Sequence, residues 1–299
     1  MTMTTDHDPD QFLRSGSGFR VRVYKPKTMN KRNWINRFQE AHGHRPWALV
    51  TGGSSGMGLE YARQLAEIGC NLLLVSNQEA ELQQVAEELK QGRTIQVIPH
   101  YQNLATETAA DELLAYCQSE GLQVDILINN AGMFFFEELT TQNEAKALTM
   151  MRLHILTPTR LCVVFGEAMK QRGYGYLINM SSMAAALPCP GITIYSATKA
   201  YLKSFGKSLY FEMRPYGVGV TTVCPAAIAT PLYKLKPSLM KFGVKIGVIG
   251  TPQWLVRKAL KGMMKKKRVV KPGFMNLYLP PLIAILPHGL VNTLWQKYK

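Results

Sequence analysis

Residues 47–58 read WALVTGGSSGMG, an apolar run that ends in a glycine-rich loop. The helical pattern GLEYARQLAEIG follows at residues 58–69 and stops at a glycine. Glycines at 52, 56 and 58 allow a ligand to approach the backbone closely, and the first N–H groups of the helix suit a pyrophosphate. An ordinary turn can also be rich in glycine, but the position between a first strand and a helix favours a dinucleotide site.

The same alternation of strand and helix continues along the chain. The remaining strands are predicted at residues 71–76, 94–101, 125–132, 175–182 and 218–226, and the helices at 79–90, 106–120, 143–171 and from 194 onward. The strands are continuous apolar runs, which is typical of a parallel sheet covered by helices on both faces. We therefore predict an α/β fold, a single domain with a doubly wound parallel sheet of the Rossmann type.

Charge divides the 299-residue chain, whose net charge is +15, into three parts. Residues 46–230 hold 12 basic and 16 acidic residues, whereas residues 231–299 hold 14 basic residues and no acidic one. We expect a polar and then basic N-terminal extension at 1–45, a domain at 46–273 with a substrate lid at about 231–250, and an apolar, basic segment at 274–299. Basic ends of this kind suit a membrane surface, a polyanion or an acidic substrate.

Several classes of protein are disfavoured by what the sequence lacks. No run of eighteen apolar residues predicts a membrane-spanning helix, and the polar N-terminus lacks the apolar stretch of a secretory signal. A second methionine, Met29, is an alternative start of the chain. The five scattered cysteines favour reduced thiols in the cytoplasm, and the six histidines make no metal motif. The sequence contains neither an aromatic-and-glycine RNA-binding motif nor a helix-turn-helix signature, which disfavours a nucleic-acid partner. The segment 274–299 suits either peripheral membrane contact or packing on the core or a subunit interface.

Four motifs then occur in a fixed order: TGGSSGMG at 51–58, NNAG at 129–132, NMSS at 179–182 and YSATK at 195–199. Together they resemble the classical short-chain dehydrogenase/reductase family over about residues 46–275. Within it, the wording IYSATK is similar to the branch of 17β-hydroxysteroid dehydrogenases and long-chain 3-oxoacyl-CoA reductases. The resemblance implies an NAD(P)-dependent oxidoreductase that interconverts a ketone and a secondary alcohol, and a homo-oligomer.

The resemblance also implies catalytic roles. Tyr195 exchanges the proton with the substrate oxygen, Ser182 holds that oxygen, and Lys199 binds the nicotinamide ribose. An isolated Y-x-x-x-K is more often a packed tyrosine and a solvated lysine, yet an ammonium one helical turn away does favour tyrosinate. His154 stands where the family has an asparagine that holds a relay water. It either replaces that asparagine in the relay or is a structural histidine with satisfied hydrogen bonds.

The dinucleotide is expected to be NADP(H) rather than NAD(H). At the tip of the second strand, Ser76 and Asn77 provide neither an acid that would repel a 2′-phosphate nor an arginine that would clamp it, and the nearby Glu79 leaves NAD(H) open. The predicted cofactor-binding residues are Thr51, Gly52, Ser54, Ser55, Gly56, Met57, Gly58, Asn77, Asn103, Asn130, Ala131, Gly132, Tyr195, Lys199, Pro225, Ile228 and Thr230.

The expected substrate is apolar. Residues 183–194 are small and apolar, and the expected lid at 231–250 is apolar with four lysines. Such a pocket suits a ketone on a steroid, bile acid or 3-oxoacyl chain, with or without an anionic group, although the lysines also fit a solvated basic face. The alternative is a non-catalytic cofactor-binding or membrane-surface protein on a retained dehydrogenase fold, against which the complete Ser-Tyr-Lys set argues.

Overall fold

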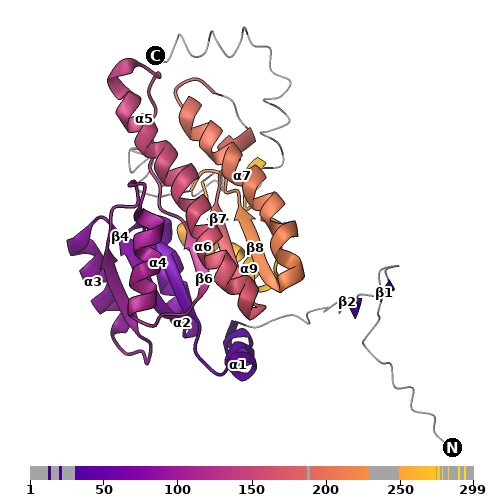
Figure 1. The fold of residues 1–299 in the computed structure, drawn as a ribbon. Helices are drawn as coiled ribbons and strands as arrows, with labels where there is room; N and C mark the ends of the chain where they lie inside the picture. Colours follow the sequence, from indigo (N-terminus) through magenta and orange to yellow (C-terminus); the bar gives the residue numbers. More distant parts are fainter. Residues whose placement is uncertain are drawn as a thin grey trace, which may run out of the picture.

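The computed structural model describes residues 31–186, 189–228 and 249–273, with the pairs 13–14 and 20–21 and a few single positions beyond 273. Its centre is a seven-stranded, entirely parallel sheet in the order β5-β4-β3-β6-β7-β8-β9 (Figure 1). The strands are β3 (Trp47–Thr51), β4 (Asn71–Ser76), β5 (Val97–Tyr101), β6 (Val124–Asn129), β7 (Gly175–Met180), β8 (Val218–Val223) and β9 (Val269–Val270). The two-residue strands β1 (Leu13–Arg14) and β2 (Arg20–Val21) pair with each other. The doubly wound prediction is confirmed.

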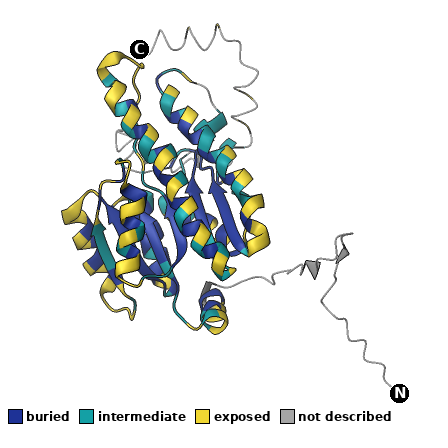
Figure 2. Ribbon diagram, viewed as in Figure 1, coloured by how far each residue is buried: buried dark blue, intermediate teal, exposed yellow. Residues whose placement is uncertain are grey.

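Successive residues of a strand point to opposite sides of the sheet, and here both sides are apolar. Helices therefore cover both faces. One face packs against α1 (Lys31–His42), α2 (Gly56–Ile68), α3 (Glu79–Lys90) and α9 (Pro252–Met264). The other packs against α4 (Ala109–Ser119), α6 (Thr157–Arg172) and α7 (Thr193–Met213). The central strands are buried, the edge strands β5 and β9 are mostly half-buried, and the outer helix surfaces are exposed (Figure 2). No helix in the described part of the chain is long and apolar enough to cross a membrane.

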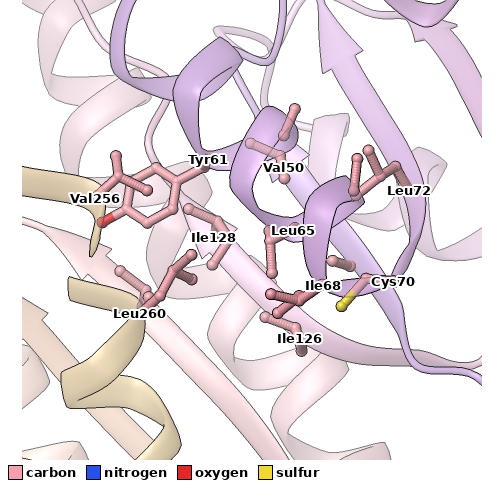
Figure 3. Packing of buried hydrophobic residues seen from close by; sticks show 14 of the residues in the cluster. Val50, Tyr61, Leu65, Ile68, Cys70, Leu72, Ile126, Ile128, Val256 and Leu260 are labelled. Atoms are coloured by element: carbon pink, nitrogen blue, oxygen red, sulfur yellow. The ribbon is translucent and has the colours of Figure 1, made fainter. Parts of the chain in front are cut away.

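The core under α2 and α9 joins the beginning of the domain to its end. Tyr61 of α2 is fully buried beside Val256 and Leu260 of α9 (Figure 3). The Tyr61 hydroxyl lies 3.2 Å from the Met180 sulfur. Burial in this cluster raises the pKa of the Tyr61 phenol, so the ring serves as an apolar filler.

Part of the predicted N-terminal extension belongs to the folded core. Helix α1 buries Trp34, Ile35 and Phe38 on the face shared with α2. The Phe38 ring lies edge-on to the Tyr174 ring, with 5.8 Å between their centroids. The basic residues of this stretch therefore accompany an apolar anchor that holds the helix on the domain.

The helix predicted at 143–171 is interrupted. It consists of a short 3₁₀ turn, η1 (Thr141–Asn143), then α5 (Glu144–Met151), the π-helical turn η2 (Arg152–Leu156), and α6. A π turn inserts one extra residue into the helical register, and such turns are frequent at functional sites. Two further 3₁₀ turns, η3 (Met183–Ala186) and η4 (Arg214–Tyr216), flank α7. Nearly all of the expected lid and of segment 274–299 lies outside the described residues.

Candidate active site

A cavity of about 500 Å³ opens where the carboxyl ends of β3, β4, β6 and β7 meet. The chain leaves β3 toward β4 on one side and returns to β6 on the other, and such a switch point is the usual ligand site of an open α/β sheet. The predicted residues that line the cavity are Gly52, Ser54, Ser55, Gly56, Met57, Asn77, Asn103, Asn130, Ala131, Gly132, His154, Ser182, Tyr195, Lys199, Pro225 and Ile228. Thr51 and Gly58 do not line it, and Thr230 lies outside the described residues.

The glycine-rich loop forms a cradle at the start of α2. Gly52 and Gly56 have φ angles of +67° and +55°, in the left-handed region that side chains disfavour. A Cβ atom on Gly52 would lie only 3.0 Å from the Ala131 Cα atom. At Gly58 a Cβ atom would overlap the carbonyl oxygen of Gly52. Gly58 therefore lets the helix pack on the turn, and does not itself face the cavity.

Thr51 supports the site from behind. Its hydroxyl accepts hydrogen bonds from the backbone N–H groups of Asn130 and Ala131, at 2.9 and 3.0 Å, and donates to the Ile128 carbonyl at 3.1 Å. The side-chain amide of Asn130 donates in turn to the backbone carbonyl of Thr51 at 3.0 Å. These bonds fasten the end of β3 to the loop after β6, which fixes the spacing of the two cavity walls.

A polar edge lies at the end of β4. The Ser54 hydroxyl is 2.8 Å from the Ser76 hydroxyl and donates to the side-chain oxygen of Gln78 at 3.1 Å. The Gln78 N–H donates to the Ser76 oxygen at 3.2 Å. Gln78 was not among the predicted residues, although its place two residues past the strand pointed to this edge. Among the described residues that line the cavity there is no acidic side chain.

Tyr195 and Lys199 lie one turn apart on α7, and each is 6% exposed. The Lys199 ammonium donates to the Met180 carbonyl at 3.0 Å and lies 5.6 Å from the centre of the Tyr195 ring. Burial lowers the pKa of Lys199 to about 7. At neutral pH this side chain is therefore divided between its charged and neutral forms.

The two serines after β7 differ in their contacts. The Ser181 hydroxyl donates to the Lys199 carbonyl at 2.7 Å, which ties it to the backbone of α7. The Ser182 oxygen accepts a hydrogen bond from the Ala184 N–H at 3.1 Å. This bond does not involve the hydroxyl hydrogen of Ser182, which can still be donated. Ser182 can thus donate to a substrate oxygen in the cavity, which is the role that the family resemblance implies for it.

His154 lies in the π turn and is only 1% exposed. Its Nε2 atom accepts the Met133 N–H at 3.1 Å, so the neutral ring carries its proton on Nδ1. That proton is donated to the Thr198 hydroxyl at 3.0 Å, which donates to the Tyr195 carbonyl at 2.9 Å. Burial, and then the charge of Lys199, hold the pKa of His154 well below its usual value. The imidazole is neutral and both its nitrogens have protein partners.

Packing around His154 is equally close. A Cβ atom on Gly132 would lie 2.6 Å from the His154 Nε2 atom, so only glycine fits there without movement. The imidazole lies edge-on to the Tyr195 ring with a centroid separation of 5.8 Å. Thr198 and Met133 are the hydrogen-bond partners of His154. The sequence did not predict either, because both lie far from His154 along the chain.

The wall beside Tyr195 is apolar. The Phe134 ring meets the Tyr195 ring at 90°, with 4.9 Å between centroids. Phe135 and Met150 are buried in the same cluster, against which Ile192 and Ile194 pack. A reacting group near the Tyr195 hydroxyl would thus border on aromatic and aliphatic side chains.

Comparison with known proteins gives consistent results. A sequence model described as short chain dehydrogenase matches residues 46–238. The very-long-chain 3-oxoacyl-CoA reductase of Mus musculus is 32% identical over 204 residues, which cover 65% of this chain and 64% of that protein. The 17-beta-hydroxysteroid dehydrogenase type 3 of the same organism is 31% identical over 192 residues, with 63% and 62% covered. The chain thus matches slightly less than two thirds of the length of either relative.

A solved structure also resembles the chain. The short-chain dehydrogenase from Sphingobium yanoikuyae in complex with NADPH superposes with a TM-score of 0.68 at 26% sequence identity. The superposition covers 81% of this chain and 97% of that one. The similarity therefore extends over the sheet and its covering helices.

Proposed function

Since the chain belongs to the short-chain dehydrogenase family, we propose that it is an oxidoreductase that interconverts an apolar ketone and a secondary alcohol with a nicotinamide cofactor. One observation carries this proposal: Ser182, Tyr195 and Lys199 line one cavity that begins at the glycine-rich turn. The reductase and dehydrogenase named among its relatives support it.

The cavity fits a dinucleotide. Gly52 and Gly56 have left-handed backbone angles beside the first turn of α2, which brings backbone N–H groups to the space where a pyrophosphate would lie. Tyr195 and Lys199 lie at the other end of the same cavity. The bound dinucleotide would supply the hydride for reduction, and the remaining steps belong to the protein.

Those steps start from the substrate oxygen. In reduction, Ser182 donates a hydrogen bond to the carbonyl oxygen, which gathers negative charge as its carbon is reduced. Tyr195 passes its phenolic proton to that oxygen, and in oxidation it takes the proton from the alcohol. Lys199, which has a pKa of about 7, stabilises the tyrosinate in its charged form and would bind the ribose hydroxyl groups of the cofactor.

His154 acts in this proposal as a positioning residue and not as the proton relay. Both ring nitrogens are already engaged, by the Met133 N–H and the Thr198 hydroxyl. Its depressed pKa also removes the means of exchanging protons near neutrality. The imidazole instead joins the loop after β6 to α7 close to Tyr195, and so holds the catalytic phenol relative to the cavity wall.

NADP(H) is the proposed cofactor, as the strand-tip residues suggested. The polar edge of Ser54, Ser76 and Gln78 offers hydroxyl and amide groups, and no described residue lining the cavity carries a negative charge that would repel a 2′-phosphate. The NADPH complex of the Sphingobium relative supports the same choice.

A steroid, bile acid or 3-oxoacyl chain is the proposed substrate class. Phe134 and Phe135 beside Tyr195 favour an apolar body next to the reacting carbonyl. The names of the two mouse relatives refer to a 3-oxoacyl-CoA and to a hydroxysteroid. In both compounds the reacting group is attached to a large apolar skeleton.

The deciding experiment measures the loss of NADPH absorbance by purified protein with keto-steroids, keto-bile acids and 3-oxoacyl-CoAs, and repeats it with NADH. The Tyr195→Phe variant is the matched control, since it removes one hydroxyl and keeps the ring. Turnover that this variant loses would support the proposal. Silence across the panel, with NADPH binding intact, would instead favour a non-catalytic cofactor-binding protein.

A further inference from the structure

A second concave surface lies away from the active site, between α9 and β9. It has a volume of about 320 Å³, and five of the residues that line it are Lys258, Lys261, Lys265, Lys267 and Lys271. We call this surface the lysine groove. Its floor includes Val269 and Val270 of β9, the strand at the edge of the sheet.

The fold directs these lysines outward. The inner side of α9 buries Val256 and Leu260 against α2, as Figure 3 shows. Lys258 and Lys261 are three residues apart, so they share the opposite face of α9, and Lys265 follows directly after the end of the helix. Gly262 faces β9, where a Cβ atom would overlap the Val270 side chain.

Neighbouring basic residues serve the fold, and the groove lysines do not. The Lys266 ammonium donates to the Gly217 carbonyl, and the Arg268 guanidinium lies 5.0 Å from the centre of the Phe211 ring. The five ammonium groups of the groove have no hydrogen-bond or ion-pair partner among the described residues. Unneutralised like charges in one small concavity repel each other, and a multivalent anionic partner relieves that repulsion.

Protection of an exposed sheet edge explains only part of this arrangement. Lysines beside an edge strand discourage pairing with another chain, which accounts for Lys267 and Lys271 next to β9. It does not account for Lys258 and Lys261, which lie on the helix. The groove therefore calls for a partner as well as a guarded edge.

The sequence that follows the groove indicates which anion. Residues 231–299 contain 14 basic residues and no acidic one, and FMNLYLPPLIAILP at 274–287 comes directly after Gly273. A basic surface followed by an apolar segment is the composition of a membrane-surface binder, whereas nucleic acid requires no apolar segment. We propose that the lysine groove docks this protein on a membrane surface rich in anionic phospholipids. This inference does not depend on the proposed catalytic activity.

The test is sedimentation of the full chain with vesicles of phosphatidylcholine that contain 30% phosphatidylserine. The groove variant carries Lys258→Gln, Lys261→Gln and Lys265→Gln, because glutamine keeps the helix propensity of lysine. The matched control carries Arg63→Gln, Lys90→Gln and Lys170→Gln on α2, α3 and α6, and it also loses three positive charges. Thermal melting of all three proteins checks that they fold.

The wild-type chain should sediment with the anionic vesicles, remain in solution with pure phosphatidylcholine, and be released by high salt. Each lysine near an anionic surface contributes roughly a fivefold change, so the groove variant should bind about a hundredfold more weakly. The control should change less than about tenfold, because none of its three substituted residues lines the groove.

Equal losses in the groove variant and the control would show that net charge alone drives binding, and would overturn the assignment. So would absence of wild-type binding at low salt. A DNA duplex that binds the wild type and not the groove variant, while vesicle binding stays equal in both, would reassign the groove to nucleic acid and refute the membrane proposal.

Discussion

Replacing Thr198 by valine tests the clamp that His154 forms. Valine nearly matches threonine in volume, so the change removes a hydroxyl and preserves packing. The His154 Nδ1–H, which now donates to that hydroxyl at 3.0 Å, loses its acceptor. The other tautomer, with the proton on Nε2, does not restore the hydrogen bonding. Nε2 lies 3.1 Å from the Met133 nitrogen, so two N–H donors would then face each other. Either tautomer leaves a buried N–H unsatisfied, at a cost of about 1–3 kcal/mol.

We therefore expect the free energy of unfolding at pH 7.5 to fall by about 1–3 kcal/mol in Thr198→Val. Urea unfolding followed by tryptophan fluorescence measures it. Thr198→Ser is the control, because it keeps the hydroxyl. In the pair Thr198→Val and His154→Leu the losses should not add, with a coupling of roughly 0.5–3 kcal/mol, since each variant breaks the same bond.

The pH dependence gives an independent check on the same clamp. Because the pKa of folded His154 lies well below that of the unfolded chain, the unfolded state binds the proton first as pH falls. The stability contributed by the neutral ring is present above about pH 6.5 and is lost below it, by up to roughly 1.4 kcal/mol per pH unit. His154→Leu should remove this part of the slope.

Turnover separates a clamp from a relay. Thr198→Val should lower kcat several-fold and leave the shape of its pH profile unchanged, because Tyr195 is less well held but its proton path is the same. Unchanged stability together with a shifted pH profile of kcat would refute this reasoning, and would return His154 to the proton relay.

Three further substitutions give direct outcomes. Tyr195→Phe should lower kcat by about 10²–10⁴, the usual contribution of a general acid or base, and a fluorescence titration should find NADPH binding unchanged. Asn77→Asp brings a carboxylate to the tip of β4 and should lower the ratio of kcat/KM for NADPH to that for NADH by about tenfold or more; an unchanged ratio would place the 2′-phosphate elsewhere. Lys199→Met should abolish turnover yet stabilise the fold at pH 7 by about 1–3 kcal/mol in urea unfolding, because burial now depresses the lysine pKa to about 7. This gain should shrink as pH rises toward 10, where the unfolded lysine also loses its charge; loss of stability at pH 7 would mean that the Met180 carbonyl bond outweighs burial.

The sheet could be predicted because its strands are buried on both faces and therefore appear as continuous apolar runs. The predicted strand ends were less accurate: two strands were expected to run on to residues 132 and 226, but residues 130–132 and 224–226 form loops past β6 and β8. The π turn at Arg152–Leu156 was not predicted, since one inserted residue leaves the hydrophobic pattern of the helix nearly intact.

The candidate active site also combines residues that the sequence predicted with residues that only the structure revealed. The family resemblance pointed to Ser182, and the bond from Ser181 to the Lys199 carbonyl supplies the physical distinction between the two serines. Gln78 and Thr198 were missed because their roles arise from contacts between distant parts of the chain. His154 could be located from the sequence, but its tautomer and both partners required coordinates.

The packing of α9 on α2 has a consequence for how the chain is made. Tyr61 is buried by Val256 and Leu260, which are synthesised almost two hundred residues later. At about 5–20 residues per second, roughly 10–40 s pass on the ribosome before this apolar surface can be covered. During that interval the apolar surface around Tyr61 stays uncovered, so the nascent chain is open to aggregation or to binding by chaperones until residue 260 has been made.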